Sequence, residues 1–111
     1  MENSAISSED IESCQKIIVE FLPPPVTEQQ RETLEKYRAG DLTEARAESI
    51  RGGDYERCLC TLLNASKDEF SPLDCLNTAA DLAIKFAGAA DGSELYAKLS
   101  EVLPKHFSES A

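Results

Sequence analysis

The sequence contains few of the residue types that carry catalysis and metal binding. Among 111 residues there is one histidine, one methionine and no tryptophan. The single histidine, His106, argues against zinc sites built from paired cysteines and histidines. It is also the one imidazole available to a Ser-His-Asp or Cys-His arrangement, and a position so near the end of the sequence is poor for orienting a catalytic base. We therefore expect no catalytic residue, no metal site and no cofactor.

Basic residues are also scarce, because 11 Lys and Arg stand against 21 Asp and Glu and give a net charge of −10. Such a charge opposes direct binding to nucleic-acid phosphates and to anionic membrane surfaces. No apolar run approaches the ~20 residues of a membrane span, and Met1 to Ser4 lack the features of a secretion signal. We therefore expect a cytoplasmic protein whose partner is another protein with a basic surface, with no direct contact to nucleic acid or membrane.

Four cysteines occur without a secretion signal, so we expect reduced thiols. Cys58 and Cys60 are two positions apart, which on a helix separates their side chains by about 200°. This separation is unsuited to holding one metal ion. Cys14, Cys58 and Cys75 are interpreted as small core residues. Cys60 falls on the other side of its helix and is expected to be an exposed thiol, unless the fold brings Cys75 against it.

The strongest structural pattern lies between Ser71 and Gly88. Ser71 and Pro72 suit an N-cap and a first helical position, and Gly88 suits a left-handed C-terminal cap. Apolar residues cover most of the circumference of this helix and leave one narrow polar strip. The strip comprises Asp74, Asn77, Thr78, Asp81 and Lys85. We therefore expect a central helix at about 72–87.

Helical periodicity and capping residues predict further short helices around this one. Their expected ranges are about 8–22, 27–39, 42–50, 54–67 and 93–103. No segment alternates like a strand, so the predicted fold class is all-α: a compact bundle of five to six short helices around the central helix. We expect a disordered N-terminal arm at 1–7, a single helical domain at 8–104 and a flexible C-terminal tail at 105–111.

The apolar surface of the central helix bears on the oligomeric state. If three neighbouring helices cover it, Leu82, Ile84 and Phe86 are all buried within one molecule. If they do not, the remaining apolar arc is a face through which two copies form a homodimer.

Two acidic helix faces are the candidate partner-binding sites. Their residues are Glu9, Glu12 and Glu20 in the first expected helix and Glu28, Glu32 and Glu35 in the second. The first helix offers the better negative surface, because Lys16 is its only base. Bases interleave with the acids of the second, and the charge from residue 28 to residue 38 sums to zero. The second stripe therefore fits equally well a solvent-exposed face laced with salt bridges.

Three hypotheses about function follow, each from a different class. The preferred one is a small non-catalytic interaction or regulatory module that binds its partner through a helix face. The second is an acidic inhibitor of a nucleic-acid-acting protein, such as a toxin-immunity or phage counter-defence protein, whose carboxylates occupy a cleft built for phosphates. The third is an enzyme using carboxylates or Cys60, which a concave pocket with a perturbed carboxylate pair would indicate.

Overall fold

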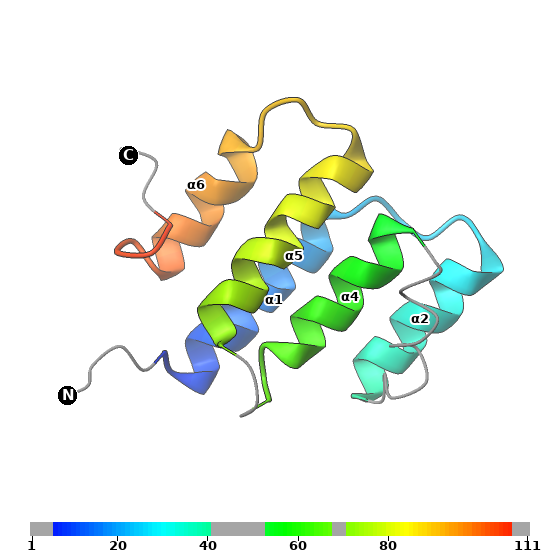
Figure 1. Cartoon of the computed structure of the whole chain (residues 1–111), viewed down its shortest axis with the longest axis horizontal. Coiled ribbons are helices and arrows are strands. Elements are labelled where there is room, and N and C mark those ends of the chain that lie inside the picture. The colour runs from blue at the N-terminus through cyan, green and yellow to red at the C-terminus, as the bar shows by residue number, and fades with distance from the viewer. Residues whose placement is uncertain (1–5, 41–52, 68–70, 108–111) are drawn as a thin grey trace.

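The described parts of the protein, residues 6–40, 53–67 and 71–107 of a computed structural model, contain helices and no strand (Figure 1). The helices are α1 (Ser8–Phe21), α2 (Glu28–Ala39), α4 (Asp54–Asn64), α5 (Pro72–Ala87) and α6 (Ser93–Val102). The predicted all-α bundle is therefore confirmed. The helix expected at 42–50 lies outside the described residues.

Local side-chain caps fix three of the helix starts. At α5, the Asp74 N–H donates a hydrogen bond to Ser71 Oγ at 3.3 Å, and Ser7 caps α1 in the same way. At α2, Thr27 and Gln30 form a reciprocal capping box, in which each side chain accepts a hydrogen bond from the backbone N–H of the other. Caps of this kind contribute about 0.5–2 kcal/mol each. These hydrogen bonds confirm the predicted starts of α2 and α5.

The helix α5 packs against α1, α4 and α6, which are the three neighbours that its apolar circumference requires. Figure 1 shows α5 between α6 and α4, with α1 crossing behind it. Its most extensive contact is with α4. The buried side chains of α5 are mostly small: Cys75, Leu76, Ala79, Ala80 and Ala83. The predicted polar strip faces solvent, with Asn77 half-buried at its edge.

The remaining apolar side chains of α5 are covered in part. Leu82, Ile84 and Phe86 are half-buried and pack against the core, and the Phe86 ring lies 5.2 Å from that of Tyr55. The structure therefore does not show the first alternative, in which all three side chains are fully buried within one molecule. Within the described residues, however, Val26 is the only large apolar side chain that is exposed. The homodimer stays a prediction, with no exposed apolar face on α5 to support it.

The core continues past α6 as far as Phe107. The backbone N–H groups of His106 and Phe107 both donate to the Leu103 carbonyl at 3.0 Å, which folds the polypeptide back into a turn. Phe107 is 3% exposed, and its ring lies 6.1 Å from that of Tyr96. The packed region thus extends beyond the boundary expected at 104, because an aromatic residue after the turn completes the core. At the other end, Ile6 packs against the core from within the arm expected at 1–7.

Candidate functional site

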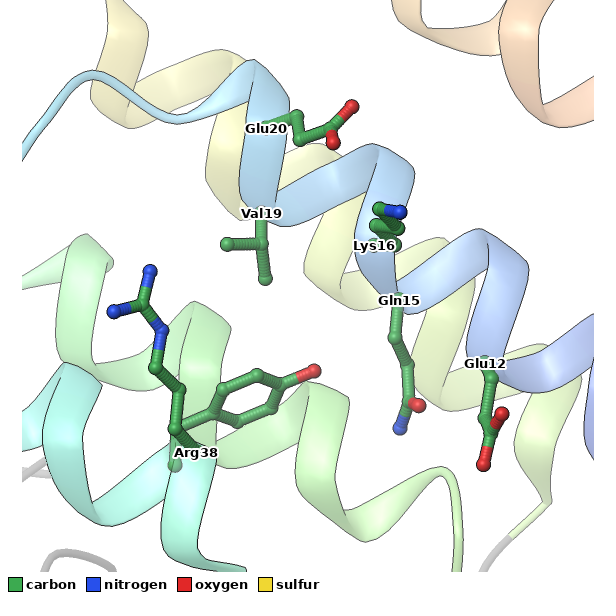
Figure 2. Close-up of a pocket in the computed structure, with 7 residues that line it drawn as sticks. Glu12, Gln15, Lys16, Val19, Glu20 and Arg38 are labelled. Atoms are coloured by element: carbon green, nitrogen blue, oxygen red, sulfur yellow. The ribbon is translucent and has the colours of Figure 1, made fainter.

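A groove of about 390 Å³ lies between α1 and α2. It forms because α1 packs on α5 and α6, whereas α2 packs on α4. Figure 2 shows Val19 and Gln15 extending from α1 and Arg38 facing them from α2. The groove is lined by Glu12, Gln15, Lys16, Val19, Glu20, Tyr37 and Arg38. Apolar and charged side chains from two helices therefore meet at one concave surface.

The candidate acids of α1 share one outward face. Glu9, Glu12 and Glu20 are all exposed and lie, with Lys16 between them, within about 80° of the helix circumference. Glu12 and Glu20 also line the groove. No described residue forms an ion pair with any of these four side chains. Their charges are consequently not neutralised by contacts within the described parts of the protein.

The candidate acids of α2 form a separate exposed stripe. Glu28, Glu32 and Glu35 lie opposite Gln30 and Thr33, the two buried residues of α2. None of the three glutamates lines the groove, where α2 contributes Tyr37 and Arg38 instead. The structure therefore brings only part of the predicted set of six glutamates to one place.

Gln15 ties the α1 wall of the groove to α4. Its side chain is 8% exposed, and Nε2 donates to the Leu62 carbonyl at 2.7 Å and to Ser66 Oγ at 2.8 Å. A carbonyl can only accept, so the amide nitrogen is the atom that faces α4. No described residue donates a hydrogen bond to Gln15 Oε1. Gln15 was not among the predicted site residues, although a polar residue between Ile11 and Ile18 at core-facing spacing was a usable signal.

Tyr37 forms the opposite wall. Its ring packs against Cys60 and the main core, and its side chain is half-buried. Burial raises the pKa of Tyr37 to about 12, with a smaller contribution from nearby Cys58. No described residue hydrogen-bonds its hydroxyl group. The groove thus holds a half-buried tyrosine whose hydroxyl group has no hydrogen-bond partner in the described structure.

All four cysteines are buried free thiols, so the expectation that Cys60 is exposed is wrong. Cys60 is 7% exposed and packs against Tyr37, while Cys58 donates to the Ala79 carbonyl at 3.3 Å. Both sides of α4 are covered because α5 and α2 both pack on it. Burial first, and a nearby aspartate second, raises the pKa of Cys14 to about 11 and that of Cys58 to about 12.

We expect the thiols of the folded protein to react slowly with a disulfide reagent such as DTNB. Only the thiolate reacts, and at pH 8 the pKa of about 11 of Cys14 lowers the thiolate fraction of that residue on the order of 100-fold relative to a free cysteine. Burial slows the reaction further. The measurement compares thiol release in buffer with that in denaturing urea, where all four cysteines should react at the rate of free cysteine. A fast-reacting Cys60, identified by mass spectrometry of peptides, would contradict the packing of Tyr37 over it.

The groove does not hold the close carboxylate pair that would indicate an enzyme using carboxylates. Glu12 and Glu20 are exposed and two helical turns apart, about 12 Å along the axis, so they do not share a proton. His106 is exposed in the turn after α6. In the described ranges, no cluster of three His, Cys, Asp or Glu side chains is arranged to hold a metal ion. The enzyme hypothesis stays a prediction from the sequence.

No protein-family model, no curated protein and no solved structure matches this sequence. None of the described helices is long and apolar enough to cross a membrane. Function must accordingly be argued from the groove, from the exposed charges beside it and from burial.

Proposed function

We propose that the protein is a non-catalytic interaction module that binds a basic partner protein through the outward face of α1. The observation that carries this proposal is the exposure of Glu9, Glu12 and Glu20 on one face, where Lys16 is the only base of α1 and no described residue forms an ion pair with these glutamates. Carboxylates that are not neutralised by intramolecular contacts are able to steer and orient a positively charged surface. The net charge of −10 adds a long-range attraction to the same kind of partner.

The α2 stripe is a weaker candidate for the same role. Its three glutamates are exposed, but Arg31 and Arg38 are also exposed on the same helix. A basic partner approaching α2 meets these like charges together with the carboxylates, which reduces the net attraction. The α1 face has one base among three acids and suits a basic partner better.

Two triple variants with equal charge changes test this assignment. We expect the α1 triple variant to recover at least about tenfold less partner from a native extract than the unsubstituted protein does. The α2 triple variant should recover as much as the unsubstituted protein. Recovery by the unsubstituted protein should also decrease as salt is raised from about 50 mM to about 500 mM, because exposed charges are screened. The α1 variant carries Glu9→Gln, Glu12→Gln and Glu20→Gln, and the α2 variant carries Glu28→Gln, Glu32→Gln and Glu35→Gln.

The α2 variant is the matched control, because it removes the same number of negative charges from another helix. Equal recovery by both variants, or a loss confined to the α2 variant, would contradict the assignment to α1. Circular dichroism and the urea unfolding midpoint establish that each variant retains its fold. Quantitative mass spectrometry identifies the protein whose recovery separates the two variants.

The narrower hypothesis of an inhibitor of a nucleic-acid-acting protein stays a prediction, since charge alone motivates it. It adds one requirement, which is that duplex DNA or RNA competes with this protein for the recovered partner. Cytoplasmic localisation is likewise a prediction from the sequence.

A further inference from the structure

Three consecutive prolines connect α1 to α2, at the edge of the molecule (Figure 1). Leu22, the residue after α1, has φ −67° and ψ 140°, which are angles of a polyproline II helix. Each proline fixes its own φ at about −65° and keeps the preceding residue out of the α-helical region. The peptide bonds of the segment are trans. Pro23, Pro24 and Pro25 therefore continue the polyproline II conformation that begins at Leu22.

The burial of this segment repeats every three residues. A polyproline II helix has three residues per turn, so residues i and i+3 lie on one edge of a triangular cross-section. Leu22 is buried and Pro25 is half-buried, which places one edge against the protein. Pro23 and Val26 lie on the second edge and Pro24 on the third, and all three are exposed. The segment thus presents two of its three edges to solvent.

Hydrogen bonds at both ends hold the segment in place. The Leu22 N–H donates to the carbonyl groups of Ile18 and Val19 at 3.2 and 3.1 Å, and the Val26 N–H donates to Gln30 Oε1 at 2.8 Å. Gln30 is itself fixed by the capping box at the start of α2. A partner that binds this segment therefore meets a preformed surface, and binding does not have to order it.

The two outward edges are apolar and carry no charge. Val26 is 76% exposed and is the only large apolar side chain that is exposed among the described residues. Pro23 and Val26 occupy the i and i+3 positions that a PxxP motif fills with two prolines, and valine is an apolar side chain of similar size. Proline has no N–H, so the backbone offers carbonyl acceptors to a partner. Aromatic grooves that contain Trp or Tyr supply both apolar ring faces and the matching donors.

We propose that residues 23–26 are the docking site for a proline-reading domain, meaning a domain that binds polyproline II segments in a groove lined by aromatic side chains. The groove receives Pro23 and Val26 on one edge of the segment and Pro24 on the other. Pro25 stays against the protein and does not enter the groove. This inference goes beyond the proposed function, because it assigns a second class of partner to an uncharged segment outside the acidic face of α1.

SH3, WW and EVH1 domains are the probes, each titrated without label into the isotope-labelled full-length protein and followed by NMR. We expect at least one of these classes to bind, with the largest shifts at the backbone N–H groups of Val26 and Thr27. A hexaproline peptide should displace the bound domain, because it occupies the same groove. Displacement separates this mode from attraction of a basic domain to the net charge of −10. Failure of all three classes to bind, or shifts that map elsewhere, would overturn the proposal.

Pro24→Ala and Val26→Ala test the two outward edges with the domain that binds. Each substitution removes two carbon atoms from the contact and should weaken binding at least about tenfold, as expected for two buried CH₂ groups. Pro25→Ala is the control on the inward edge. It removes only stiffness from the segment and should weaken binding less than about fivefold. Equal losses from Pro24→Ala and Pro25→Ala would contradict the assignment of the outward edges.

Pro104→Ala is the control outside the segment, because Pro104 is an exposed proline after α6. It should leave the affinity for the domain unchanged. Circular dichroism and the urea unfolding midpoint establish that each variant retains its fold. A loss caused by Pro104→Ala as large as that caused by Pro24→Ala would show that the domain does not recognise residues 23–26.

Discussion

Replacing Leu76 by alanine should lower the free energy of unfolding by about 2–5 kcal/mol, the range for deleting a buried leucine side chain. Leu76 is 0% exposed and lies on the face of α5 that packs against the other helices. The loss combines the transfer of its methyl and methylene groups with the cavity left behind. Urea unfolding monitored by circular dichroism provides the measurement.

Thr78→Ala is the control for this experiment, since Thr78 is exposed on the polar strip of the same helix. Its effect should stay within about 0.5 kcal/mol, as is usual for surface substitutions. An unfolding midpoint of Leu76→Ala equal to that of Thr78→Ala would show that this face of α5 is not in the core.

Phe107→Ala should lower the free energy of unfolding by about 3–5 kcal/mol if its ring is packed as a core side chain. The ring is 3% exposed, contacts Tyr96 and belongs to the main hydrophobic cluster. His106→Ala is the matched control, because His106 is exposed in the same turn and its hydrogen bond to Leu103 involves only the backbone. Thermal and urea unfolding of the two variants give the comparison. A Phe107 variant as stable as the His106 variant would place residue 107 in a free tail.

The parts of the fold that were predictable depend on local chemistry. Ser71, Pro72 and Gly88 set the two ends of α5 through contacts with their own neighbours in sequence, and Thr27 with Gln30 does the same at the start of α2. Such signals can be read from a few consecutive residues. The polar strip of α5 was also readable, because helical periodicity is fixed regardless of what packs against the helix.

The errors arose where tertiary packing decides burial. Helical periodicity predicts one covered side for α4 and therefore an exposed Cys60, whereas α2 and α5 both pack on this helix. Phe107 follows Pro104, where helical periodicity ends and no longer indicates which residues face the core. The burial of both residues depends on packing partners that lie far away in sequence or beyond a turn.

The candidate site was predictable only in part. The acidic face of α1 follows from spacing alone, and Glu12 and Glu20 were identified in that way. The groove beside it depends on how α1 and α2 are held apart by packing on different helices, which no local pattern encodes. Gln15 was predictable only in part. The sequence shows a polar residue at a core-facing position, but it does not show which hydrogen bonds the side chain forms.

The small side chains on the buried face of α5 have a consequence for how this sequence can drift. Ala79, Ala80 and Ala83 are all 0% exposed and carry almost nothing that a mutation can remove. Enlarging them forces side chains or helices apart, at a cost of typically about 1–3 kcal/mol each. Glycine, the only smaller residue, costs about 1 kcal/mol relative to alanine within a helix, so this face tolerates little change in side-chain size. Substitutions that enlarge these alanines should be depleted in any library selected for folding. At Leu76, substitutions that shorten the side chain should be depleted.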